Sequence, residues 1–185
     1  NSPVWKTLPV YTLGKNRGAA EAPHAKTTFQ IAYDHENVYI RFEADLKKEL
    51  MDFQQRGRDA EIWLQECLNL CIAPGGDKSQ YYYFNFEPVV NSFTDAQHGF
   101  ITDPLDPKFG WNDNSWNGDW KYENILQKDK DKWLALVTLP IKMFKNGIPK
   151  SGDMWYANFG RVHYKKRTND LADDEMMKTR ELSVW

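Results

Sequence analysis

The clearest feature of the chain is a regular alternation of apolar and polar residues in two neighbouring segments. Large apolar residues occupy every second position in 29–33 and again in 38–42. This period of two is typical of β-strands that bury one face. The polar residues 34–37 lie between the two segments and favour a turn. We therefore predict a β-hairpin over residues 27–46.

A second pair of strands is predicted around the two cysteines. Residues 73–79 are rich in Pro, Gly and Asp, which favours a turn, and residues 80–89 then return as a strand. The strand before the turn has two distinct sides. Its expected core side carries Leu64, Leu68, Leu70 and Ile72, and its other side carries Trp63, Cys67, Asn69 and Cys71.

The second half of the chain repeats the same short alternating segments. Charged residues form the tip of another predicted hairpin, and the last predicted strand stops in mid-pattern at Trp185. The strands predicted here cover residues 120–127, 132–140, 154–164 and 179–185.

The remaining segments are predicted to be loops. Residues 141–153 resemble a helical turn followed by a loop. Residues 91–119 are polar and read as a long loop, and a loop of that length in a compact domain is usually functional or hides short strands. Many short strands with almost no helical period predict an all-β antiparallel sandwich. The chain has 185 residues, which suits one domain, so residues 1–185 are predicted to form a single unit.

Charge and hydropathy exclude two classes of partner. The net charge is −2, which is not the basic footprint of a nucleic-acid-binding protein. No apolar run approaches the roughly 20 residues of a membrane span. We therefore expect no nucleic acid and no membrane span, and we expect the domain to be a monomer.

The aromatic content, 15% of the residues, is the unusual part of the composition. It fits either a large aromatic core or a binding surface. Trp120 and Trp133 begin alternating strands and are predicted to lie in the core. Trp111 and Trp116 are flanked by Asn, Asp and Gly, and we expect them at the rim of a surface site or pinning the long loop.

The cysteines and acidic residues point to no defined metal site. Cys67 and Cys71 are four residues apart on one strand face, about 13 Å, which exceeds the reach of a disulfide. They are predicted to be free, mostly buried thiols. Oxygen ligands suitable for calcium occur at Asp45, Asp52 and Asp59 and in residues 103–114.

Catalysis is not predicted. The acidic groups in residues 59–66 and 170–175 have no spacing that requires an active site, and the four histidines are scattered. Charged loops of this kind are usually solvated. No nucleophile motif, phosphate-binding loop or dinucleotide fingerprint is present.

Six motifs follow one another from about Trp5 to Trp185. Together they resemble carbohydrate-binding module family 9 and its family-9-like relatives. The motifs are Tyr-Asp-x-x-Asn-Val-Tyr at 33–39, Asp-x-x-Ile-Trp at 59–63, an acidic residue and Cys opening an apolar strand that ends in Pro at 66–74, a Tyr-rich strand at 81–88, a strand ending in Leu-Pro at 132–140, and Asn-Phe-x-Arg at 158–161.

The resemblance implies a β-sandwich of jelly-roll type that binds sugars without catalysis and holds structural calcium. In the family a sugar, often at its reducing end, lies between two tryptophans. Trp63 matches the first of them. Asn69 stands where the family usually has a sugar-binding Glu, and Tyr83 stands near the position of a sugar-binding Arg. The second tryptophan would fall beyond Trp185.

The sequence thus predicts a sugar-binding module for a mono- or oligosaccharide, associated with polysaccharide degradation and secreted, periplasmic or on the cell surface. The alternative is a sandwich that has lost the sugar site and serves as a structural or interaction domain. Related sandwiches hold haem between Met and His, but no Met–His spacing here points to that. The predicted sugar-binding residues are Trp63, Asn69, Tyr83, Trp111 and Trp116.

Overall fold

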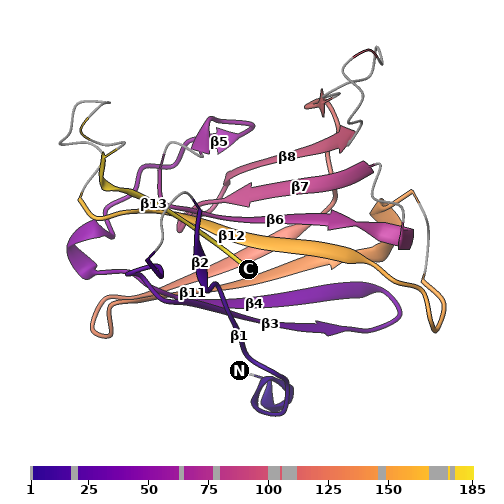
Figure 1. Cartoon of the computed structure of the whole chain (residues 1–185), viewed down its shortest axis with the longest axis horizontal. Helices are drawn as coiled ribbons and strands as arrows, with labels where there is room; N and C mark the ends of the chain where they lie inside the picture. The colour runs from indigo at the N-terminus through magenta and orange to yellow at the C-terminus, as the bar shows by residue number, and fades with distance from the viewer. Residues whose placement is uncertain are drawn as a thin grey trace.

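A computed structural model shows two β-sheets packed face to face (Figure 1). The predicted antiparallel all-β sandwich of jelly-roll type is confirmed. Within the described part of the chain, no helix is long and apolar enough to cross a membrane. The structure describes residues 2–17, 21–62, 65–76, 80–99, 105, 112–145, 149–166, 175 and 178–185.

The smaller sheet has five strands and contains both predicted hairpins. Its order is β1-β3-β4-β11-β10. The strands are β1 (Tyr11–Thr12), β3 (Thr27–Tyr33), β4 (Asn37–Asp45), β10 (Lys121–Gln127) and β11 (Lys132–Pro140).

The larger sheet has the order β2-β13-β12-β6-β7-β8-β5, and β9 also pairs with β8. All its described neighbours are antiparallel except β5 and β8, which run parallel. The strands are β2 (Lys15–Asn16), β5 (Gly57–Arg58), β6 (Cys67–Ala73), β7 (Gln80–Phe86), β8 (Ser92–Gly99), β9 (Asn112–Asp113), β12 (Tyr156–Tyr164) and β13 (Arg180–Val184).

Short 3₁₀ turns connect several of these strands. The predicted helical turn after residue 140 is present as η5. The turns are η1 (Pro3–Lys6), η2 (Lys48–Leu50), η4 (Pro74–Gly76) and η5 (Ile141–Met143).

The predicted hairpin with its short polar turn is present as β3 and β4. Phe29 lies opposite Phe42, so the apolar residues of both strands share one face. At the turn, Oδ1 of Asp34 accepts hydrogen bonds from the backbone N–H groups of Glu36 and Asn37. The Asp at this position therefore closes the turn by pairing two otherwise free backbone donors.

Residues 91–119 do not form one long loop: β8 and the short strand β9 lie within them, which is the alternative of hidden strands. The core-facing positions of β8 explain why the sequence hides it. Asp95 and Gln97 face inward with the apolar residues of β7, and both are buried. With polar residues on the buried face, the strand has no hydrophobic alternation to detect.

The core between the sheets is aromatic and closely packed. Trp133 is fully buried and Trp120 is 8% exposed, as predicted for both. Phe29 stacks on Phe159 of the opposite sheet with ring centroids 4.2 Å apart. Both cysteines are free, as predicted, with Cys67 buried and Cys71 half-buried.

One buried ionic network joins the two sheets. The Arg161 guanidinium on β12 donates from Nε to Oε1 of Glu66 at 2.6 Å. It also donates to Oγ1 of Thr27 at 3.0 Å and to the carbonyl of Asp45 at 2.7 Å, and both of these belong to the smaller sheet. Nδ1 of His163 lies 2.8 Å from the second Glu66 oxygen.

The Glu66 carboxylate stays ionised in this buried position. Burial by itself raises the pKa of Glu66, but the charges of Arg161 and His163 outweigh it and hold the pKa below its usual range. A buried carboxylate is tolerated only when it is paired and hydrogen-bonded in this way.

A second buried carboxylate organises the Trp-rich segment before β10. Both oxygens of Asp95 accept from Arg58, at 2.7 and 2.9 Å. One of them also accepts from the backbone N–H of Gly118 at 2.7 Å and from Nε1 of Trp120 at 3.1 Å. Gly118 is required here, because an added Cβ would lie 2.7 Å from the Trp116 ring.

We expect Arg161→Met to lower the free energy of unfolding by about 3–5 kcal/mol, because it leaves the Glu66 carboxylate buried without its main partner. The matched control is Lys132→Ala, which breaks the half-exposed ion pair with Asp45 and should cost less than about 1 kcal/mol. Urea unfolding measures both. Equal, small losses would show that the buried pair does not hold the sheets together.

Glu87 follows β7 and is a buried acid of a different kind. It is fully buried, and its Oε2 has no hydrogen-bond partner among the described residues. Burial raises the pKa of Glu87 to about 7, although the charge of Arg56 opposes the rise. The folded protein therefore holds this proton more tightly than the unfolded chain does.

The stability contributed by that proton is fully present below pH 4.5 and is lost as the pH rises through about 7. Between pH 4.5 and 8, the wild type should lose roughly 3 kcal/mol of unfolding free energy relative to Glu87→Gln. Urea unfolding at a series of pH values measures the difference. Parallel pH profiles for the two proteins would contradict the raised pKa.

Candidate functional site

The outer face of the larger sheet, which points away from the core, carries the candidate site. Side chains alternate between faces along each strand, and cross-strand partners share a face. Leu70, Phe84 and Phe159 point inward, so their neighbours in sequence point outward. The outward residues of the four central strands are Tyr156, Asn158, Gly160, Val162 and Tyr164 on β12, Cys67, Asn69, Cys71 and Ala73 on β6, Tyr81, Tyr83 and Asn85 on β7, and Thr94, Ala96 and His98 on β8.

Three aromatic side chains form one group on this face. The rings of Tyr81 and His98 are stacked, with centroids 5.0 Å apart and planes 7° apart. Tyr83 meets His98 edge-on at 5.4 Å. All three are half-buried, so each keeps part of its surface toward solvent.

Amide side chains lie beside the aromatic group. Asn69 faces Gly160 on one side and Asn85 on the other. The Asn69 amide lies directly over Gly160, because an added Cβ there would be 2.5 Å from Oδ1 of Asn69. Glycine at position 160 therefore provides the space in which the amide sits.

Asn85 is the deepest polar residue of the face. It is fully buried, and neither its Oδ1 nor its Nδ2 makes a hydrogen bond of normal geometry with a described residue, although the amide lies close enough to the Tyr83 hydroxyl to lower the pKa of Tyr83. A buried amide without partners costs free energy, and such groups usually bind an ordered water or a ligand. The face therefore offers hydrogen-bonding capacity that the described side chains do not use.

The central part of the face is electrically neutral, although the charge of Glu87, just after β7, reaches Cys67. None of its outward residues on the four central strands is Asp, Glu, Lys or Arg. Burial lowers the pKa of His98, raises the pKa of Tyr83, and raises the pKa of Cys71 to about 11. All these groups are therefore uncharged near neutral pH, which suits an uncharged polar ligand better than an ion.

The structure brings two of the predicted sugar-binding residues together. Asn69 and Tyr83 lie on this one face in adjacent cross-strand rows, because Asn69 pairs with Asn85 and Tyr83 pairs with Cys71. Trp63 and Trp111 lie outside the described residues.

Trp116 lies on the opposite face of the sheet from Asn69 and Tyr83. Its ring packs on Tyr82 at 4.8 Å and on Phe84 at 5.9 Å, and both of these point into the core. The structure therefore does not bring Trp116 to the candidate site. Its contacts are those of a residue that pins the loop to the core.

The sequence did not single out Tyr81, His98 or Asn158. His98 lies on β8, a strand that the local pattern does not reveal because its buried face is polar. Tyr81 and Tyr83 share the period of two in the Tyr-rich strand, so that pattern could have identified Tyr81 as well. Asn158 is exposed at the edge of the same face, and only its pairing with β6 places it there.

Calcium has no candidate cluster in the described part of the chain, where no three His, Cys, Asp or Glu side chains converge. The structure does not gather the predicted ligands Asp45 and Asp59: Asp45 pairs with Lys132, and Asp59 lies beside Arg58. Most of residues 103–114 lies outside the described residues. Structural calcium therefore remains a prediction.

The fold and this face together define a β-sandwich whose broad sheet presents aromatic rings and amides. Comparison with solved structures finds the same architecture in carbohydrate-binding proteins. A candidate carbohydrate-binding protein from Bacteroides uniformis ATCC 8492 matches with a TM-score of 0.66 at 12% sequence identity, over 98% of this chain and 78% of that one.

Two structures of a family 9 carbohydrate-binding module from Caldicellulosiruptor kristjanssonii also match. The complex with glucose has a TM-score of 0.60 at 9% identity, over 91% of this chain and 73% of that one. The complex with cellotriose has a TM-score of 0.61 at 10% identity, over 99% and 74%. The resemblance to family 9 modules is thus confirmed for the fold. Neither a scan against protein-family models nor a search of curated protein sequences found a match.

We expect Gly160→Ala to displace the Asn69 amide and to cost about 1–3 kcal/mol of stability, as overpacking does. The same change in an Asn69→Ala background should cost less, since the clashing amide is gone. Urea unfolding of the four proteins measures the coupling between the two positions. Additive losses would mean that Gly160 does not position Asn69.

Proposed function

We propose that this domain is a non-catalytic carbohydrate-binding module whose site is the outer face of the larger sheet. The observation that carries the proposal is the uncharged surface on which Tyr81, Tyr83 and His98 lie beside the amides of Asn69 and Asn158. The architecture shared with family 9 modules supports the same assignment.

In the proposed mode of binding, aromatic rings contact the C–H faces of a sugar. A pyranose ring has apolar C–H faces and a rim of hydroxyl groups, so it needs flat apolar surfaces beside polar groups. Tyr83 and the stacked Tyr81–His98 pair supply the flat surfaces. A well-packed aromatic contact contributes on the order of 1 kcal/mol.

The amides bind the hydroxyl groups. An amide offers both a carbonyl acceptor and two N–H donors, and a hydroxyl group needs both kinds of partner. Asn69 therefore performs with neutral hydrogen bonds the role that Glu has in the family pattern. Neutral hydrogen bonds are weaker than charge-assisted ones, so affinities in the micromolar to millimolar range follow.

The wider setting is part of the proposal. Trp63 provides a further stacking ring, and structural calcium supports the fold. The module acts as a monomer outside the cytoplasm, in association with polysaccharide degradation. Whether it recognises a reducing end is decided by comparing each sugar with its reduced alditol.

Titration with glucose, cellobiose, cellotriose and xylobiose, followed by calorimetry and tryptophan fluorescence, tests the proposal. At the larger-sheet face, Tyr83→Ala and Asn69→Ala should each weaken binding about fivefold to tenfold, and Trp63→Ala should abolish binding at that face, with the fold retained. Tyr33→Ala removes a tyrosine that is 79% exposed on the smaller sheet and should change nothing.

Unchanged binding in the Tyr83 and Asn69 variants would remove the site assignment. Absence of binding to every sugar would instead favour a structural or interaction domain on the same sandwich.

A further inference from the structure

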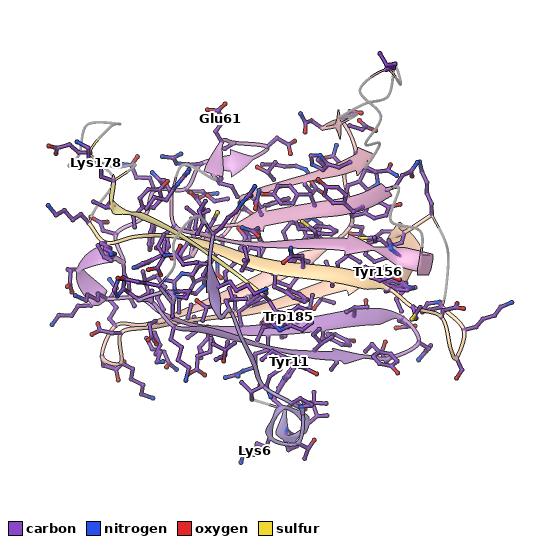
Figure 2. The ribbon with its side chains drawn as sticks, viewed as in Figure 1. Lys6, Tyr11, Glu61, Tyr156, Lys178 and Trp185 are labelled. Carbon is purple, nitrogen blue, oxygen red and sulfur yellow. The ribbon has the colours of Figure 1, made fainter. Side chains whose placement is uncertain are left out.

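A separate groove of about 500 Å³ lies on the outer face of the smaller sheet, beneath the N-terminal segment. Trp5 of η1 and strands β3, β4, β10 and β11 line it. In Figure 2, Lys6 marks η1 at the lower edge of the molecule, far from β7 and β8 at the top. The groove is therefore distinct from the face that carries Asn69 and Tyr83.

A buried glutamine holds the N-terminal segment over this groove. Gln30 points outward from β3, yet it is only 4% exposed. Its Nε2 donates to the carbonyl of Trp5 at 2.6 Å and to that of Leu8 at 3.1 Å. These two bonds hold the backbone of Trp5 over the sheet, so its indole lines a fixed groove.

The polar groups of the groove are also held in place. Arg41 donates through Nη1 to Oε1 of Gln30 at 3.0 Å and through Nη2 to Glu43 at 3.3 Å. A guanidinium group has five N–H donors, so most of those of Arg41 remain for a ligand. The exposed carboxylate of Glu123, on β10, supplies acceptors to the same groove.

The floor of the groove is apolar. Leu134 and Leu136 point outward from β11, and Ile125, opposite Leu134, is 59% exposed. An aliphatic floor with an indole at its margin provides flat apolar surface, and Arg41, Gln30 and Glu123 provide convergent hydrogen-bonding groups.

The balance of charges favours an uncharged ligand. Arg41 is paired with Glu43, and Lys6 and Glu123 contribute one charge of each sign to the groove. An anion would be repelled by Glu123, and a cation would be repelled by Lys6 and Arg41. A neutral polyhydroxylated ring would have its C–H face covered by the indole and its hydroxyl groups bonded by the charged side chains.

We infer that this groove is a second, independent carbohydrate-binding site, so that the domain can hold a neutral oligosaccharide on each of its two sheets. The inference shares its ligand class with the proposed function but depends on none of the same residues.

The test is a titration of ¹⁵N-labelled protein with cellotriose, followed by NMR. The indole N–H of Trp5 and the backbone amides of Arg41 and Leu136 report on the groove, and those of Asn69 and Tyr83 report on the larger sheet. Saturable shifts are expected in both sets. Trp5→Ala should weaken binding at the groove at least tenfold without changing the second set.

Val4→Ala is the matched control, because Val4 is on the same 3₁₀ turn and 45% exposed but does not line the groove. It should leave both sets unchanged. Glu123→Gln changes an exposed residue of β10 and should weaken groove binding several-fold. This variant keeps the groove testable if the Trp5 variant misfolds.

Each outcome separates the two proposals. Shifts confined to the larger sheet would overturn the second site and leave the proposed function supported. Shifts confined to the groove would support the second site and overturn the assignment of the first. Shifts in neither set, with cellotriose and with each of the other sugars titrated above, would overturn both.

Discussion

A guanidinium group buried between the two sheets constrains how they pack. Arg161 is 1% exposed, and its donors reach Glu66, the hydroxyl of Thr27 and the carbonyl of Asp45. Removing a charge from water is costly, and only several well-placed partners compensate for it. Because those partners come from both sheets, the guanidinium specifies how the sheets are placed as well as holding them together.

The strand that carries this group also shapes the candidate site on its other side. Arg161 points inward, and its neighbour Gly160 points outward beneath the Asn69 amide. The same alternation governs β8, where Asp95 points inward and holds Arg58, Gly118 and Trp120, while His98 points outward and stacks on Tyr81. Core and site are thus built on opposite faces of the same strands, so a shift in register would disrupt both.

The outer faces of the two sheets differ in chemistry. The larger sheet presents neutral amides and aromatic rings, and burial keeps its titratable groups uncharged. The smaller sheet presents an aliphatic floor with charged groups of both signs, covered by the N-terminal segment that Gln30 anchors. In the proposed binding modes, an uncharged polar ligand would be held mainly by neutral hydrogen bonds on the larger sheet and mainly by charge-assisted hydrogen bonds on the smaller sheet.

The sequence by itself determined the strands whose buried faces are apolar. The hairpins β3–β4 and β10–β11 alternate regularly, and the buried positions of Trp120 and Trp133 follow from the same local period. The alternation in β6 also separated Asn69 from the leucine side of its strand, whereas Tyr83 came only from the resemblance to family 9 modules. Periodicity failed at β8, because its buried face carries Asp95 and Gln97, whose partners lie elsewhere in the chain.

Only the tertiary structure decided which distant residues meet. Glu66 and Arg161 are 95 positions apart, and no local pattern shows that each is the charge the other requires. Likewise, the polar neighbours of Trp116 in the sequence are those expected around an exposed tryptophan. Its ring nevertheless packs inward, because Asp95 and Gly118 shape its loop. Burial of polar groups is settled by partners remote in sequence, whereas burial of apolar faces is already encoded in the local spacing of residues.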